Sequence, residues 1–183
     1  MTNNSIHIFM KSKTETILMV LNTLVWIVFV GLMVETGAIL ISFIISLVKP
    51  EDAKNLYKDV DLLELRRSGI VAYFFLVSVL IGLTAVKSFS AYLVLKILTQ
   101  IKLANPFKIE IAQLMEKISY YILAVWVVSI LLKMTIEILV QKHFLLRISS
   151  ESGEYLFLAG IIFIFAQVFK KGIEIQSENE LTV

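Results

Sequence analysis

Four long runs of apolar residues decide what this chain can fold into. The runs are residues 17–34, 69–86, 118–140 and 155–169. A helix needs about 20 apolar residues to cross the core of a bilayer, and it pairs its backbone polar groups within its own segment, as lipid requires. Because 58% of the 183 residues are apolar, a water-soluble fold has too little interior to bury them all. The sequence therefore predicts an all-α fold, a polytopic transmembrane four-helix bundle that forms one domain over residues 1–183.

Several of the predicted helices should extend beyond the bilayer. The first run continues past Glu35 to residue 48, and the second continues to about residue 103. Pro50 should end the first of these helices. The segment from Ala53 to Leu63 has apolar residues at helical spacing, so it predicts a short amphipathic helix at the membrane surface.

The corner before the third run contains the sequence NPF, which is Asn105, Pro106 and Phe107. A proline disfavours helical geometry at the residue before it and suits the first turn of a new helix. This segment therefore predicts a turn between two helices, and it is also a candidate docking loop.

The lysines and arginines favour a cytoplasmic N-terminus. With that orientation, slightly more of the 17 basic residues lie on the cytoplasmic side, as the positive-inside rule requires. Four crossings bring both termini to the same side, so the tail at residues 170–183 should also be cytoplasmic.

Residues that carry enzyme chemistry are scarce in this sequence. It has no cysteine, and its two histidines, His7 and His143, fall in different segments outside the apolar runs. No phosphate-binding, dinucleotide-binding or hydrolase motif occurs. We therefore expect no catalytic site, no cofactor and no metal site, and we expect that the chain is not an enzyme. The net charge of +2 argues against direct binding of nucleic acid.

Three ionisable residues, Glu35, Lys133 and Glu137, are candidate intramembrane polar residues. A charge at the bilayer centre costs on the order of 2.5–3.5 kcal/mol, so an interfacial position for Glu35, at the end of a span over residues 17–34, is the less costly interpretation. If the whole run to residue 48 were one tilted helix, Glu35 would be an intramembrane carboxylate. Lys133 and Glu137 lie near the outer end of the third span, as an interfacial pair or as part of an outward-facing cavity.

Four other residues bear on helix packing. Ala159 and Gly160 would let a neighbouring helix approach closely, either within the bundle or in a homo-oligomer. Asn22 and Gln167 could form hydrogen bonds between helices, which usually contribute about 0.6 kcal/mol each.

The C-terminal sequence IFIFAQVFKKGIEIQSENELTV resembles the C-terminus of a bacterial family of small four-span membrane proteins, the domain-of-unknown-function family 2975. The residues that match its closing pattern are Phe169, Gly172, Glu178, Asn179, Leu181, Thr182 and Val183. The corner NPFKIEIAQLMEKISY is similar to the family's segment before its third span, through Pro106, Phe107 and Ile118. The resemblance covers roughly the C-terminal half. It implies a multi-pass protein of the bacterial cytoplasmic (inner) membrane with no established activity, from a family whose members often appear beside a small helix-turn-helix regulator.

Two functional hypotheses arise. The first is a non-enzymatic regulatory or scaffolding protein, surrounded by the lipid bilayer, that binds a cytoplasmic partner such as a helix-turn-helix regulator. The candidate docking residues are Asn105, Pro106, Phe107, Glu178, Asn179, Leu181, Thr182 and Val183. The tail could be captured as a short peptide through its carboxylate, or its last residues could pack against the protein's own helices. The alternative is a small membrane transporter, or an immunity or stress protein, that uses the outward-facing polar groups Glu35, Lys133 and Glu137.

Overall fold

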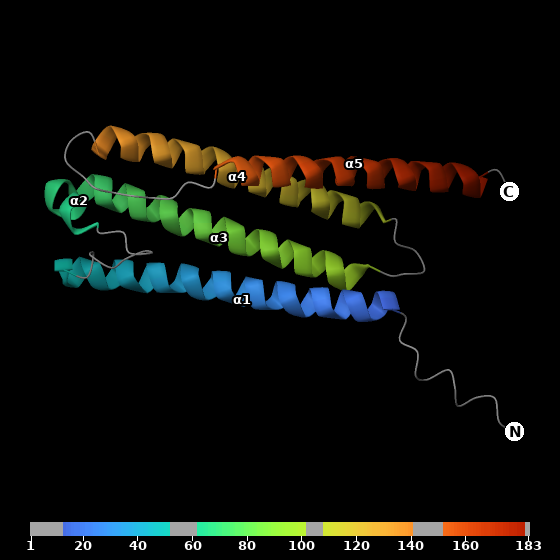
Figure 1. Ribbon diagram of the computed structural model, residues 1–183, viewed down its shortest axis with the longest axis horizontal. Helices are drawn as coiled ribbons and strands as arrows, with labels where there is room; N and C mark the ends of the chain where they lie inside the picture. Colours follow the sequence, from blue (N-terminus) through green and yellow to red (C-terminus); the bar gives the residue numbers. More distant parts are fainter. Residues whose placement is uncertain (1–12, 52–61, 102–107, 141–151, 182–183) are drawn as a thin grey trace, which may run out of the picture.

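The computed structural model describes residues 13–51, 62–101, 108–140 and 152–181, and these are almost entirely helical. The helices are α1 (Lys13–Val48), α2 (Leu63–Ser68), α3 (Ile70–Gln100), α4 (Ile109–Val140) and α5 (Ser152–Leu181) (Figure 1). All of them except α2 are long and apolar enough to cross a membrane. The predicted all-α fold with four membrane-spanning helices is confirmed.

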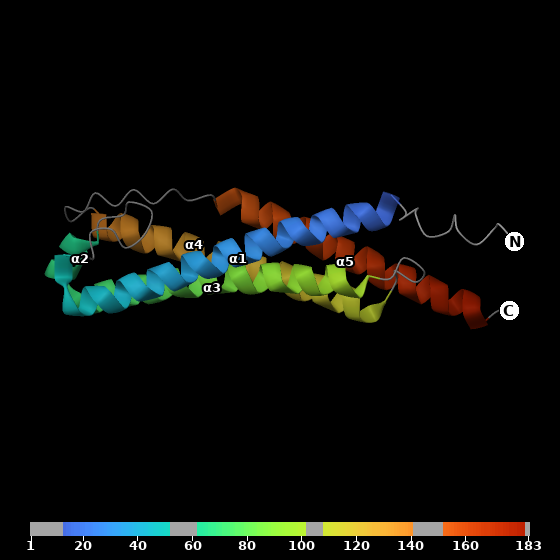
Figure 2. The same ribbon diagram turned by 90° about the horizontal axis from the view of Figure 1, so that it is seen from below.

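The four long helices pack as antiparallel neighbours in chain order. α1 packs against α3, α3 against α4, and α4 against α5, and among the described residues the backbones of no other two long helices lie close together. Figures 1 and 2 show the result, an open row of helices. α1 and α5 are its two edges, so much of the apolar surface of both is left for other molecules to cover.

α1 starts and α5 ends at the same end of the bundle, which we call the terminal end, and α2 lies at the opposite end, which we call the α2 end (Figure 1). α5 is displaced along the bundle relative to the other helices. It begins alongside the middle of α3, and its last part runs past the ends of α1, α3 and α4 in both views (Figures 1 and 2). The C-terminal part of α5 therefore projects from the terminal end.

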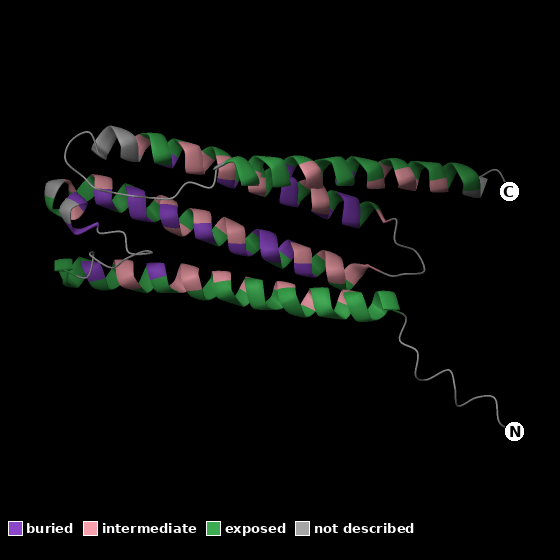
Figure 3. Ribbon diagram, in the orientation of Figure 1, coloured by how far each residue is buried: buried purple, intermediate pink, exposed green. Residues whose placement is uncertain are grey.

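The first apolar run and its continuation form one unbroken helix, α1, of 36 residues, or about 54 Å at 1.5 Å per residue. Residues 36–48 therefore belong to the same helix as residues 17–34. Its apolar side chains are exposed along its whole length, for example Val34 at 66%, Ile41 at 58% and Val48 at 82% (Figure 3). The exposed apolar surface along α1 is longer than a bilayer core is thick, which is about 30 Å. The apolar run alone therefore does not determine how deep Glu35 lies in the membrane.

A core cluster with buried residues from α1, α2, α3 and α4 lies toward the α2 end, where Figure 3 shows buried positions on α1 and α3. Its buried residues are Ile39, Leu62, Leu63, Leu65, Tyr73, Leu76, Val77, Leu80 and Leu132. α2 turns directly into α3 at Gly69, whose amide donates to the Leu65 carbonyl oxygen at 2.9 Å. Arg66 of α2 donates to the Leu47 carbonyl oxygen at 3.3 Å, which satisfies a carbonyl in the last turn of α1. α2 thereby joins the ends of α1 and α3.

Several helix boundaries differ from those expected. α4 begins at Ile109, close to the helix start expected at the NPF corner. α5 continues to Leu181, so residues 170–181 belong to a helix and do not form a separate extended tail. α3 ends at Gln100. The helix expected from Ala53 lies mostly outside the described residues.

Candidate functional site

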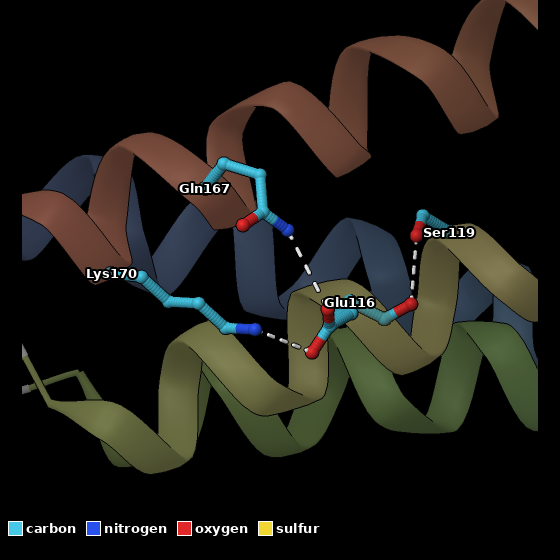
Figure 4. Close-up of polar contacts among 4 residues, drawn as sticks. All are labelled: Glu116, Ser119, Gln167 and Lys170. Carbon is cyan, nitrogen blue, oxygen red and sulfur yellow. Dashed lines mark hydrogen bonds and ion pairs between the residues drawn. The ribbon is translucent and has the colours of Figure 1, made fainter.

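A polar cluster joins α4 to α5 near the point where α5 leaves the bundle (Figure 4). The Glu116 carboxylate of α4 accepts a hydrogen bond from Lys170 Nζ at 2.8 Å and one from Gln167 Nε2 at 3.5 Å, both from α5. Ser119 Oγ donates to the backbone carbonyl oxygen of Glu116 at 2.7 Å. Both oxygens of the Glu116 carboxylate are therefore used, and the base of the projecting segment is fixed to α4.

The spacing of residues along α5 explains why these side chains meet. Gln167 and Lys170 are three residues apart, so they lie on one side of the helix. Ala159 and Ala166, with exposed fractions of 4% and 0%, let the backbone of α5 approach its neighbour closely. The side chains of Lys170 and Glu116 keep 36% and 23% of their surface exposed. Solvent screens a partly exposed pair of this kind, so it adds little stability, and it helps to set the position of α5 against α4.

The projecting segment of α5, residues 171–181, is acidic on its exposed surface. From Gly172 to Leu181 it carries three glutamates and no lysine or arginine. Lys171 at its base pairs with Glu174 at 2.6 Å, and Glu174, Ile175, Glu178 and Asn179 are exposed. At 1.5 Å per residue the segment is about 16 Å long, which is enough for a helical surface that a second protein could bind.

The predicted docking residues fall into two groups in the structure. Glu178 and Asn179 lie on the projecting segment, whose last helical residue is Leu181. The others, Asn105, Pro106, Phe107, Thr182 and Val183, lie outside the described residues. α3 ends and α4 begins at the terminal end (Figure 1), so the connection that contains residues 105–107 links helices at the end from which α5 projects.

The predicted intramembrane residues lie on α1 and α4, two helices whose backbones are not close neighbours. Glu35 of α1 is half-buried and Lys133 of α4 is exposed. Lys133 follows Leu132, which belongs to the core toward the α2 end. The side chain of Glu137 is outside the described residues.

Sequence reasoning missed three charged residues that form contacts between helices: Glu116, Lys170 and Lys87. Lys87 lies in the middle of α3 and places its Nζ 5.0 Å from the centroid of the Tyr155 ring on α5, a cation–π contact. The sequence indicated that one helix runs through Lys87 to about residue 103, but it gave no sign that Lys87 contacts α5. Glu116 and Lys170 gave no signal, because they are far apart in the sequence.

A shallow apolar groove of about 280 Å³ runs between α4 and α5. The residues that line it are Ser119, Tyr120, Leu123, Leu156, Ala159, Gly160 and Phe163. Ala159 is buried, whereas Gly160 is exposed and a methyl group added there would meet nothing within 4 Å. The close helix approach predicted for this pair therefore occurs at Ala159 and not at Gly160.

The comparisons with known proteins give one result. A family model described as "Protein of unknown function (DUF2975)" matches residues 49–183. The match starts at the end of α1 and includes every later helix, so it extends further toward the N-terminus than the C-terminal half that carried the resemblance. No curated protein and no solved structure matches the chain.

Proposed function

The chain belongs to the DUF2975 family, and we propose that it is a non-enzymatic regulatory or scaffolding protein whose projecting α5 segment binds a cytoplasmic protein. The observation that carries this proposal is the continuation of α5 as a helix beyond the ends of the other helices (Figures 1 and 2). A membrane-spanning helix needs no such extension to cross a bilayer.

The base of the segment is well suited to presenting a rigid surface. The Glu116–Lys170 ion pair and the buried Ala166 hold α5 against α4 where the projection starts. A surface that is ordered before binding loses less conformational entropy when a partner binds. The partner therefore meets a helix that is already formed.

The chemistry of the segment indicates what kind of protein would bind it. Exposed glutamates at positions 174 and 178 surround the exposed apolar side chain of Ile175. A complementary partner has a basic surface with a small apolar depression, because complementary charges select and steer partners. A helix-turn-helix regulator has a basic surface where it contacts DNA phosphates. Binding to α5 would hold such a regulator at the membrane and cover that surface.

The proposal includes an orientation, with both termini in the cytoplasm of a bacterium and α2 outside the cytoplasmic membrane. Two findings support it. The basic residues are slightly more numerous on that side, as the positive-inside rule requires, and α1 starts at the end of the bundle where α5 ends (Figure 1).

Cross-linking in the native membrane tests the proposal. The full-length protein is compared with a chain that lacks residues 178–183 and with Glu178→Lys, and the cross-linked proteins are identified by mass spectrometry. Glu154→Lys is the matched control, since it makes the same charge change at an exposed position at the other end of α5. We expect the deletion and Glu178→Lys to reduce recovery of a basic partner at least tenfold, while Glu154→Lys leaves it unchanged. Equal recovery by all four chains would contradict the proposal.

Adding Glu35→Gln to this set of chains distinguishes the alternative, a small transporter or an immunity or stress protein. Such a protein would depend on Glu35 and the other outward-facing polar groups, so Glu35→Gln would abolish its function and loss of residues 178–183 would have no effect. Partner binding through α5 gives the opposite pattern.

A further inference from the structure

The apolar groove between α4 and α5 exists because α5 lacks a side chain at Gly160. This glycine is exposed, and a methyl group added there would meet nothing within 4 Å. Leu156 and Phe163 lie one turn away on the same side of α5, and Tyr120 of α4 lies across from them, with its ring centroid 6.1 Å from that of Phe163. The groove is therefore a depression between larger side chains that another molecule can fill.

The polar cluster of Glu116, Gln167 and Lys170 lies at one end of this groove (Figure 4). Ser119 belongs to both, because it lines the groove and donates to the Glu116 carbonyl oxygen at 2.7 Å. On α5, Gln167 is four residues beyond Phe163, and Lys170 is three residues further. Both therefore continue the side of α5 that lines the groove, which changes from apolar to charged over about two turns of helix.

The charged residues at this end are more basic than acidic. Lys117 of α4 and Lys171 of α5 are exposed beside the Glu116–Lys170 pair. Lys171 pairs with Glu174 at 2.6 Å, whereas Lys117 forms no ion pair with a carboxylate among the described residues. Three lysines and two glutamates leave a net charge of +1 here, which is complementary to an anion.

The groove lies between two uncharged stretches of helix, residues 118–132 of α4 and 155–169 of α5. The ion pair between the two helices aligns these stretches, and each is about 22 Å long. Lys133 and Glu154 follow at their other ends. Lipid is therefore the medium along the groove, and the lysines at its end extend toward the phospholipid headgroups.

We propose that the groove binds one acyl chain of an anionic phospholipid whose phosphate lies among Lys117, Lys170 and Lys171. Basic pockets between membrane helices bind anionic headgroups in this way, and van der Waals contact with the groove walls holds the chain. A second copy of this protein is a poorer occupant. It would cross the membrane in the same orientation and bring the same lysines to the same level, and like charges placed together oppose association.

Native mass spectrometry of the full-length protein tests this site. The protein is purified in detergent, stripped of lipid and mixed with phosphatidylglycerol, which is anionic, or with phosphatidylcholine, which has no net charge, both carrying the same acyl chains. Because one positive charge near an anionic headgroup favours binding about fivefold, we expect one phosphatidylglycerol per chain, bound about fivefold more tightly than phosphatidylcholine. Equal affinity for the two lipids would overturn the proposal.

A substitution that fills the groove tests where the acyl chain lies. Gly160→Leu should lower the affinity for both lipids by a factor of about ten, because the new side chain occupies the space of the acyl chain. Gly31→Leu is the matched control, since Gly31 of α1 is also exposed and has equally open space around it, and it should leave the affinity unchanged. Equal effects of the two variants would overturn the proposal. So would a complex of two chains that binds no lipid and that Gly160→Leu dissociates, because a second copy would then occupy the groove.

Removing two lysines tests where the phosphate lies. The double variant Lys117→Met and Lys171→Met should bind the two lipids equally, while Lys13→Met with Lys96→Met removes the same charge at exposed positions elsewhere and should keep the preference for phosphatidylglycerol. A preference that survives in both double variants would overturn the proposal. The comparison of the two lipids needs no substitution, so it decides the question even if a variant does not fold.

Discussion

The buried hydrogen bond between Ser46 of α1 and Tyr73 of α3 leads to a prediction about the order of three variants. Ser46 Oγ also lies 2.7 Å from the Phe43 carbonyl oxygen and donates its proton there. Ser46 has only one hydroxyl proton, so Tyr73 must be the donor in the bond between the two side chains. Both residues are completely buried, so neither can replace a lost partner with water.

Because Tyr73 donates this hydrogen bond and Ser46 accepts it, the three variants should lower the free energy of unfolding by different amounts. Tyr73→Phe removes the donor and leaves Ser46 bonded to Phe43, so it should lower the free energy of unfolding by about 0.6 kcal/mol, the typical value of a hydrogen bond between membrane helices. Ser46→Ala leaves the Tyr73 hydroxyl buried without an acceptor, which costs about 1–3 kcal/mol. The double variant removes that unsatisfied hydroxyl, so it should be more stable than Ser46→Ala alone.

Unfolding in mixed micelles by a denaturing detergent, followed by far-UV circular dichroism, measures these differences. Tyr120→Phe is the control, because it removes a hydroxyl from a side chain that is 55% exposed, and its effect should be within about 0.5 kcal/mol of zero. Two results would contradict this prediction. One is that Ser46→Ala lowers the free energy of unfolding no more than Tyr73→Phe does. The other is that the double variant lowers it by the sum of the two single losses.

Two further predictions concern α5. Ala159→Leu should destabilise the protein by about 1–3 kcal/mol through overpacking, whereas Gly160→Ala at the next position should be neutral or stabilising by up to about 1 kcal/mol. The same detergent titration measures both changes in the free energy of unfolding. Equal changes would contradict the packing described for these two residues. Lys170→Met removes the ion pair with Glu116 and should raise amide hydrogen exchange in residues 171–181 by up to about fivefold, while Lys171→Met, which keeps that pair, should leave the exchange near the base of the segment unchanged.

The overall architecture could be predicted from the sequence because lipid imposes a simple requirement on length and polarity. Each predicted crossing coincides with a long helix in the structure, and the family resemblance in the C-terminal half is confirmed. What the apolar runs could not show is which face of each helix packs. Tyr73 is fully buried and Phe75, two residues later, is 59% exposed, yet both are aromatic and either could face lipid or protein.

The register between helices was also hidden from sequence reasoning. Lys87 lies in the middle of α3 and contacts Tyr155 in the first turn of α5, which its neighbours in the sequence do not indicate. The displacement of α5 depends on pairs such as Glu116 and Lys170, which are 54 positions apart. Such pairs show no periodic pattern, so only the packed structure reveals them.

Cysteine labelling is the most direct test of the membrane topology. The position of every residue relative to the membrane depends on that topology. The chain has no cysteine of its own, so single cysteines introduced at Asn3, Asp61 and Thr182 report without background. In intact cells, a membrane-impermeant maleimide should modify only the cysteine at position 61, and the other two should react after the membrane is permeabilised. Modification at position 3 or 182 in intact cells would contradict four crossings with both ends in the cytoplasm.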